Sequence, residues 1–261
     1  MDANGDPQGR PEAMSDGAVS VAGRAYRLVL LSDPIFSLRK GAVVAHRLRP
    51  LVFEHVDGFS APAELDDAMI ADLSALDLEV LNRAVAMLHT PDDRARFALH
   101  VPVRLPTIGS GSGSRALIAR LNETPPAVRA AIAFCLEGLH EGTPNSRIGE
   151  AVAALRPYCR GVIACAPRAV ADIDHWSGVG VRAVSLDLAE EAFRGRAALI
   201  HDLRRFARTA RHLAPAVIAE SVGDAETAAV AAEAGFSHVC GAAVAEGALE
   251  NLTAPALRAA S

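Results

Sequence analysis

The sequence predicts an α/β protein, most simply a (β/α)8 barrel, and three observations carry this prediction. Short apolar runs alternate with longer segments in which apolar residues recur every three to four positions. Seven or eight such units follow one another, which favours parallel strands joined by helices. The chain has 261 residues, 51% of them hydrophobic and 22% charged; this is the composition of a globular protein, and the length is enough for one α/β barrel or two small domains. An open, doubly wound sheet is the alternative, because strands are hard to count from one sequence.

Both ends of the chain are expected to lie outside the barrel. Residues 1–23 hold almost no large apolar side chains, so we expect a disordered N-terminal tail. Residues 251–261 are expected to form a C-terminal tail, which places the barrel domain at residues 24–250. The N-terminal segment is polar, unlike a signal peptide, and no apolar run approaches the roughly 18 residues that a membrane span needs.

Two apolar runs open the domain and predict a hairpin. Arg27–Leu31 leads in and Ala42–Phe53 leads out, and the turn between them, Phe36–Gly41, ends in a glycine that can take a positive φ. Ala63–His89 then carries apolar residues at helical spacing, and Pro91 ends this pattern. The hairpin is therefore expected to be followed by helical structure.

The rest of the domain alternates between strand and helix patterns. The predicted strands are Phe97–Val103, Ala130–Leu136, Gly161–Ala164, Ala183–Asp187, Ala216–Ala219 and Ser237–Gly241. The predicted helices are Ser114–Asn122, Arg147–Leu155, Arg168–Trp176, Ala197–His212 and Glu226–Ala234.

Three further features are interpreted as structural. Ile108–Ser114, of sequence IGSGSGS, is expected to be a flexible surface loop, and a phosphate-binding helix N-terminus is the alternative. Trp176 is expected in an exposed loop. The arginine-rich segment Asp202–Arg211 is expected to be a solvated helix face, with contact to an acidic partner or a membrane surface as the alternative.

Charge and cysteine content narrow the class of protein. The formal net charge is −5, which gives no reason to expect a nucleic-acid partner, since such proteins present a basic face. The four cysteines lack the paired spacing of a zinc site, so we expect reduced, mostly buried thiols in a cytoplasmic protein. They are Cys135, Cys159, Cys165 and Cys240.

The order of residues in 33–52 resembles the opening of an EAL domain, the bacterial cyclic-di-GMP phosphodiesterase module. Pro34-Ile35, a turn ending in Gly41, and Val43-Val44 stand as in the family. The resemblance extends over about Ala25 to Gly247 and implies an EAL-type (β/α)8 barrel. Family phosphodiesterases hold two divalent metals with acidic residues and one Asn at the C-terminal ends of the strands.

The first of these family positions have changed in this chain. Arg47-Leu48-Arg49 stands where Glu-Ala-Leu is expected. A guanidinium about 4 Å from a dication would be repelled by roughly 8 kcal/mol at an effective dielectric of about 20. Pro102 replaces the Asn ligand. On the following strand the acidic ligand falls on Ala133 or Phe134, and Glu137 aligns with the second Glu of Glu-Ile-Thr-Glu.

The later family positions have changed as well. Ala164-Cys165-Ala166-Pro167 replaces Asp-Asp-Phe-Gly and carries no carboxylate. Ser185-Leu186-Asp187 keeps the Asp of Lys-Ile-Asp without the Lys, and Ala219–Gly223 keeps only the first Glu, Glu220. Cys240-Gly241-Ala242 replaces Gln-Gly-Tyr. We therefore expect no Mg or Mn site and no catalytic residues, and interpret Asp187 and Glu220 as a structural pair near Arg47 or Arg49.

The resemblance without these residues predicts a degenerate EAL domain that is not an enzyme. We expect a regulatory module of cyclic-di-GMP-type signalling that binds a protein partner of unknown identity, and a homodimer is a reasonable expectation. One alternative is a metal-independent cyclic-di-GMP receptor, in which the phosphates face Arg47, Arg49, Arg104 and Arg168, with Asp187 and Glu220 beside them. Another is an enzyme of different chemistry that uses Glu220 and Asp187 as acid and base.

Overall fold

The computed structural model describes residues 13–21, 23–56, 59–62, 73–89, 97–168, 172–189 and 196–245. The strands are β1 Ala13–Val21, β2 Arg24–Ser37, β3 Ala42–Val56, β4 Phe59–Pro62, β5 Ala98–Arg104, β6 Ile132–Glu137, β7 Gly161–Ala166, β8 Ala183–Asp187, β9 Ala216–Glu220 and β10 His238–Cys240. The helices are α1 Leu73–His89, α2 Leu105–Gly109, α3 Gly111–Glu123, α4 Pro126–Arg129, α5 Asn145–Leu155, α6 Arg196–Leu213, α7 Ala225–Ala234 and α8 Ala242–Ala245, with 3-10 turns η3 Arg156–Tyr158 and η4 Asp174–Trp176.

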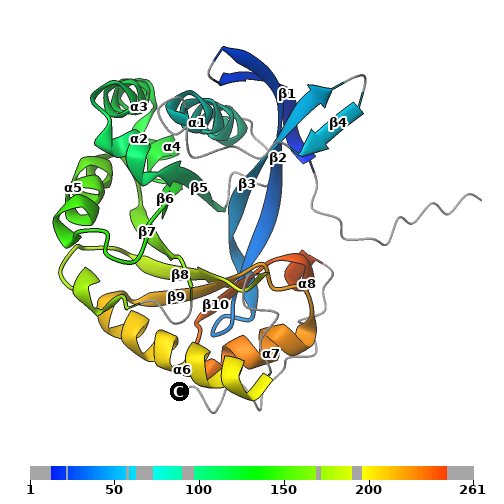
Figure 1. Ribbon diagram of the computed structural model, residues 1–261, viewed down its shortest axis with the longest axis vertical. Helices are drawn as coiled ribbons and strands as arrows, with labels where there is room; N and C mark the ends of the chain where they lie inside the picture. Colours follow the sequence, from blue (N-terminus) through cyan, green and yellow to red (C-terminus); the bar gives the residue numbers. More distant parts are fainter. Residues whose placement is uncertain are drawn as a thin grey trace, which may run out of the picture.

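The strands close into a barrel (Figure 1). Strands β3, β5, β6, β7, β8, β9 and β10 run parallel in that order. Strand β2 pairs antiparallel with both β3 and β10, and so joins the two ends of the sheet. The predicted (β/α)8 barrel is confirmed, and the doubly wound alternative is wrong because the sheet has no open edge between β2 and β3.

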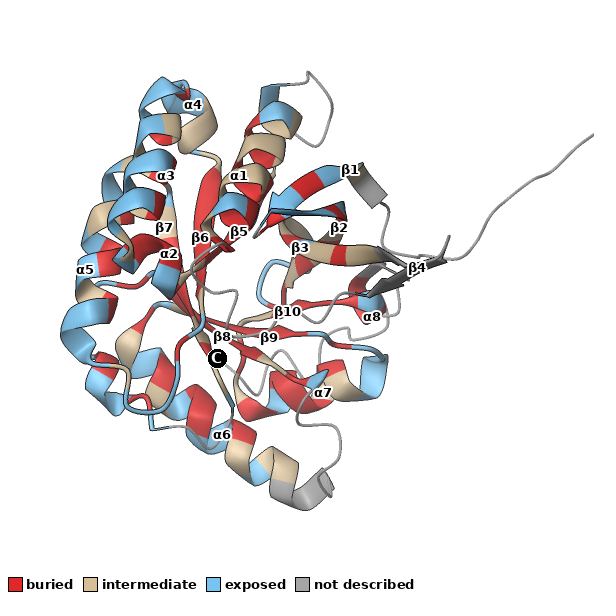
Figure 2. Cartoon of the chain, turned by 45° about the horizontal axis from the view of Figure 1, so that its top comes forward, coloured by how far each residue is buried: buried red, intermediate tan, exposed pale blue. Residues whose placement is uncertain are grey.

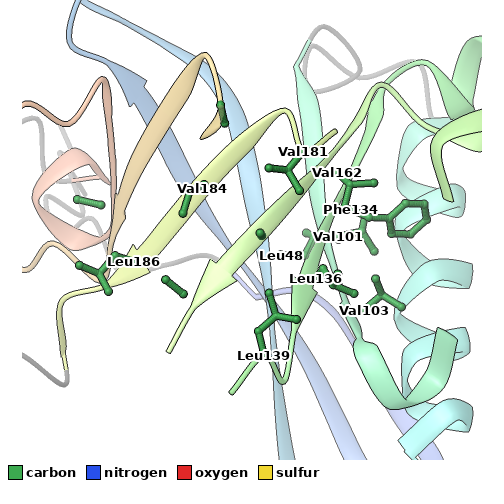
Figure 3. Close-up of a cluster of buried hydrophobic side chains, with 14 of the residues drawn as sticks. Leu48, Val101, Val103, Phe134, Leu136, Leu139, Val162, Val181, Val184 and Leu186 are labelled. Atoms are coloured by element: carbon green, nitrogen blue, oxygen red, sulfur yellow. The ribbon is translucent and has the colours of Figure 1, made fainter. Parts of the chain in front are cut away.

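Two apolar layers hold the barrel together. The larger lies between the strands and the surrounding helices, and the buried faces of the helices turn toward the strands in Figure 2. Outward side chains such as Phe134, Leu136 and Val184 belong to this layer (Figure 3). The smaller layer fills the barrel interior with Ile35, Ala45, Ala133, Cys135, Ile163, Ala183, Ile218 and Cys240. The two layers follow from the alternation of side chains along each strand.

The predicted hairpin is confirmed and longer than its apolar runs suggested. Gly41 has a φ of 62°, and its N–H donates to the carbonyl oxygen of Ser37 at 2.9 Å. The remaining predicted strands and most predicted helices are also found, with ends displaced by a few residues. Arg168–Trp176 differs, because its described part contains only the 3-10 turn η4. Pro91 and residues 63–72 and 251–261 lie outside the described residues.

The expected N-terminal tail is wrong for residues 13–21, which form β1. This strand pairs antiparallel with the first half of β2, from Ala13 opposite Leu31 to Val21 opposite Arg24. Val19 and Val21 are buried, so two small apolar residues on one face suffice to attach the strand.

Two local interpretations are also corrected. Residues 108–114 are not a flexible loop but the junction of α2 and α3, where Ser110 caps α3 by accepting a hydrogen bond from the N–H of Gly113 at 3.0 Å. A Cβ on Gly113 would lie 2.9 Å from the carbonyl oxygen of Thr107, so the glycine permits close packing. Trp176 is buried rather than exposed. Among the described helices, none is both long and apolar enough to cross a membrane.

Candidate functional site

Arg47 occupies the centre of the C-terminal end of the barrel. It lies on β3, opposite Asp33 of β2 and His100 of β5. Its guanidinium donates to Glu137 Oε1 of β6 at 3.0 Å and makes a second ion pair with Glu220 of β9. Only 14% of the side chain is exposed. One cation therefore bridges carboxylates from two strands across the barrel.

Glu220 is the most deeply buried carboxylate of this site, with 3% of the residue exposed. Burial raises its pKa to about 7, Arg47 opposes this change, and Glu137 and Asp187 reinforce it. The pKa of Arg47 is raised as well. Burial alone would lower this pKa, but the negative charge of Glu220 and those of the other acidic groups nearby together outweigh the effect of burial. The pair is thus a buried ion pair whose two members stabilise each other's charge.

Arg47 is incompletely satisfied despite its two ion pairs. Its Nε is buried and has no hydrogen-bond partner within the described residues. Arg47 therefore holds both carboxylates while one of its N–H donors stays buried and unpaired. Removing this N–H from water without a new hydrogen bond costs desolvation energy.

Three thiols lie against the ion pair from inside the barrel. A hydrogen bond with Cys135 and then burial raise the pKa of Cys165, while burial followed by the charge of Glu220 raises the pKa of Cys240. All of the cysteines are free, as the sequence predicted. Because nucleophilic cysteines need a lowered pKa, these thiols are packing groups.

The other arginines singled out in the sequence have separate partners. Arg49 Nε donates to Asp33 Oδ2 at 3.0 Å, and 44% of the Arg49 side chain is exposed. Arg104 pairs with the buried carboxylate of Asp77 on α1. Arg168 pairs with Glu141 at 2.7 Å on the surface.

Asp187 lies beside Glu220 in the β8–β9 register but does not join the ion pair. Its Oδ1 accepts a hydrogen bond from the N–H of Ala189 at 2.9 Å. No ion pair of Asp187 is found within the described part of the chain. The structure thus brings Arg47 and Glu220 together and places Asp187 next to them. Arg104 and Arg168 are instead paired with other carboxylates, away from this ion pair.

Sequence reasoning did not identify Glu137, Asp33 and Asp77 as the arginines' partners. The hairpin gives only a weak signal for Asp33, because counting outward from the turn places it opposite His46. The register shift between Ile35 and Phe36 moves it opposite Arg47, two residues from its partner Arg49. Asp77 carried no such signal, because its contact with Arg104 depends on how α1 packs against β5.

The backbone at the end of β9 and β10 keeps an unusual conformation. Ser221 has a φ of 55°, which is strained for a residue with a side chain. Gly241 has a φ of 137°, and a Cβ there would lie 2.5 Å from the backbone nitrogen of Val222. The close approach of these two strand ends therefore requires glycine at position 241.

The described residues contain no group of three or more His, Cys, Asp or Glu side chains that could hold a metal ion. The guanidinium of Arg47 contacts both Glu220 and Glu137, and a guanidinium repels a dication from the carboxylates that it contacts. The arrangement has a proton-binding group, Glu220, but no nucleophile with a lowered pKa among the residues described.

No protein-family model and no curated protein matches the sequence. The fold is similar to that of solved EAL-domain structures. The apo S helix-GGDEF-EAL structure of Vibrio cholerae LapD gives a TM-score of 0.66 at 15% identity over 84% of this chain and 53% of that chain. The Xanthomonas citri FimX EAL domain in complex with c-diGMP gives 0.61 at 17% identity over 84% and 87%.

Bacillus subtilis YkuI, with an EAL domain, in complex with c-di-GMP and calcium gives a TM-score of 0.60 at 14% identity over 81% of this chain and 52% of that chain. The chain thus spans about half the length of LapD and YkuI and most of the isolated FimX domain. These likenesses show that the fold is an EAL-type (β/α)8 barrel.

Proposed function

From this EAL-type barrel, we propose that the chain is a non-catalytic, regulatory component of cyclic-di-GMP-type signalling that acts by binding a protein partner. The observation that carries the proposal is the position of Arg47, whose guanidinium joins Glu137 and Glu220 at the C-terminal end of the barrel. Solved structures of LapD and FimX bound to c-di-GMP support the signalling context.

Arg47 makes metal-dependent hydrolysis unfavourable on electrostatic grounds. A two-metal centre needs several free carboxylates within a few ångströms of each other. Here Glu220 and Glu137 already neutralise an internal cation, and breaking a buried ion pair costs several kcal/mol. We therefore propose that the barrel persists without the metal-based activity, and that its surface contacts a protein. Self-association into a homodimer is part of the same proposal.

A metal-independent cyclic-di-GMP receptor is the second candidate. The bound dinucleotide of the LapD and FimX structures and the half-exposed guanidinium of Arg49 favour it. The ion pairs of Arg47, Arg104 and Arg168 weigh against it, because each of these arginines would have to leave its carboxylate to bind a phosphate.

Titration of the purified chain with cyclic di-GMP distinguishes these candidates. Calorimetry in magnesium or calcium, and again in EDTA, is paired with an assay of dinucleotide hydrolysis. We expect no hydrolysis and no heat up to about 100 µM, which corresponds to an affinity weaker than roughly −5.5 kcal/mol. Metal-dependent hydrolysis overturns the proposal, and tight binding that persists in EDTA selects the receptor.

Two further measurements complete the test. If binding is seen, Arg47→Ala/Arg49→Ala should weaken it, whereas Arg205→Ala/Arg208→Ala removes the same charge from exposed positions on α6 and should not. For the protein partner, a tagged chain recovers candidates from cells, and each purified candidate is then titrated directly. The absence of any direct binder, together with nucleotide binding, contradicts the interaction proposal.

A further inference from the structure

The N-terminal end of the barrel, opposite Arg47, brings together basic residues from four strand boundaries. Arg39 and Lys40 lie in the turn between β2 and β3, and this turn meets the first residue of β10, His238. Arg160 and Arg182 directly precede β7 and β8. We call Arg39, Lys40, Arg160, Arg182 and His238 the basic rim.

The turn and the start of β10 are fixed to each other by hydrogen bonds. The N–H of Leu38 donates to the carbonyl oxygen of Ser237 at 3.1 Å. Nδ1 of His238 lies 2.9 Å from the hydroxyl of Ser237, which leaves Nε2 of the imidazole for another partner. Burial lowers the pKa of His238, and Lys40 and Arg39 lower it further, so these cations lie within electrostatic reach of the ring.

The other half of the basic rim borders the floor of the barrel. Gly161 has no side chain, and a Cβ there would lie 2.8 Å from Cβ of Arg182, so the stem of Arg182 takes this space. His100 stands opposite Ala133 and remains partly exposed. Burial lowers its pKa to about 3, and Arg47, His238 and Arg160 add to this effect. A neutral imidazole is therefore held among cations from two sides.

The cations of the basic rim lack internal counter-ions. The side chains of Arg39, Lys40, Arg160 and Arg182 make no ion pair or hydrogen bond within the described residues, whereas Arg47 and Arg49 at the opposite end are both paired. Cations near helix C-termini can be explained by the helix dipole, but Arg39 and Lys40 lie in a turn between strands. A set of unpaired cations beside two neutral imidazoles is suited to a ligand that brings its own negative charge.

We propose that the basic rim is an anion-binding site for a small phosphorylated ligand. Arg39, Lys40 and Arg160 supply the positive charge, and guanidinium groups form paired hydrogen bonds with phosphate oxygens. The anion favours protonation of His238, whose Nε2 then donates to it. This inference does not depend on the proposed function, since the rim lies at the end of the barrel away from Arg47.

Calorimetric titration with inorganic pyrophosphate tests the charge requirement. The wild-type chain is compared with Arg39→Gln/Lys40→Gln and with the control Arg205→Gln/Arg208→Gln, which removes two exposed cations of α6. We expect saturable binding by the wild type, a loss of at least about tenfold in the rim variant, equal to about 1.4 kcal/mol, and a change below about twofold in the control. Failure to bind at about 10 mM, or an equal loss in the control, overturns the proposal.

Titration of the histidine imidazoles by NMR gives a readout that net charge alone does not change. Pyrophosphate should raise the pKa of His238 in the wild type, and the ring resonances of His201, exposed on α6, serve as the control that should not respond to the ligand. The shift of His238 should be absent in Arg39→Gln/Lys40→Gln. An equal response of the ring resonances of both histidines indicates unspecific ion accumulation and contradicts a site at the rim.

Discussion

Arg47 determines what the C-terminal end of the barrel can do. Its guanidinium joins two carboxylates, Glu137 and Glu220, which come from strands on different sides of the barrel interior. A buried ion pair of this kind contributes little net stability compared with apolar packing, but removing one partner leaves an uncompensated charge. The consequence is measurable in single and double variants.

Replacing Arg47 should destabilise the fold far more than replacing Arg49. Arg47→Met leaves Glu220 buried without its cation, so we expect the free energy of unfolding at neutral pH to fall by about 3–5 kcal/mol. Arg49→Met affects a half-exposed pair and should cost about 1 kcal/mol or less. Chemical denaturation measures both. Adding Glu220→Gln to Arg47→Met should recover most of the loss, and a double variant no more stable than Arg47→Met contradicts a direct pair.

Glu220 and His100 should give the stability opposite dependences on pH. The folded pKa of Glu220 is about 7, above the roughly 4.3 of an exposed Glu, so its contribution is full below pH of about 4.3 and is lost as pH rises through 7. The folded pKa of His100 is about 3, below the usual value of about 6.5. Its contribution is present above pH of about 6.5 and is lost as pH falls toward 3.

These two slopes cancel between pH of about 4.3 and 6.5, so variants are needed to see them. We expect the stability of Glu220→Gln, relative to wild type, to rise with pH in this window by up to about 1.4 kcal/mol per pH unit. His100→Gln should show the opposite relative slope. Denaturation curves at several pH values measure the differences, and two variants with the same sign of slope contradict the assignment.

Strand β1 shows how a weak pattern becomes an element through its neighbours. Its sequence has few large apolar residues, but β1 pairs antiparallel with β2 along its whole length. A side chain of α1 also contacts both strands. Arg83 of α1 donates to the carbonyl oxygen of Leu28 at 2.8 Å and lies 3.3 Å from the hydroxyl of Ser15. Both partners were distant in sequence, so composition alone pointed to a tail.

Truncation of a buried valine tests whether β1 belongs to the cooperative fold. Val21→Ala removes two methyl groups from a fully buried side chain and should lower the free energy of unfolding by about 2 kcal/mol. Ser20→Ala, at an exposed position of the same strand, is the control and should change it by about 0.5 kcal/mol or less. Thermal or chemical denaturation measures both. Equal effects of the two substitutions would mean that β1 is not part of the unfolding unit.

The strands of the barrel were predictable because their apolar runs are long and continuous. Phe134 and Leu136 face the helices while Ala133 and Cys135 face the interior, so the strand reads as buried on both sides. The junction at Ser110 was not predictable, since the glycines of that segment are there for close packing, and packing partners are invisible in a sequence.

The candidate site was predictable in its residues but not in its contacts. Arg47 and Glu220 were both identified from the strand ends, and the structure joins them. The ion-pair partner of Arg104 could not be predicted, because a long side chain at a strand end can turn inward or toward a helix. In the structure it turns toward the buried carboxylate of Asp77. The side-chain contacts of the site therefore depend on charges that the fold brings together, and the periodicity of the sequence does not determine them.

At the scale of the whole molecule, charge differs between the two ends of the barrel. The C-terminal end pairs Arg47 and Arg49 with carboxylates, whereas the cations of the basic rim have no partners within the described residues. Parallel strands bring all residues of one boundary type to one end, so this difference is built into the topology. The basic rim should accordingly respond to anions, whereas the C-terminal end, whose carboxylates are already paired, should not respond to cations.

Divalent metals should leave the thermal stability of the wild-type chain unchanged. Glu220 and Glu137 already neutralise Arg47, and no described cluster supplies three free ligands. We expect no change in Tm with millimolar magnesium or manganese, compared with sodium chloride of equal ionic strength. In Arg47→Gln the two carboxylates lose their cation, so manganese at tenfold above its Kd should stabilise that variant by about 1.4 kcal/mol, which corresponds to a rise in Tm of roughly 2–4 °C. A metal-dependent rise in the wild type itself would contradict the argument that the guanidinium has taken the place of a metal ion.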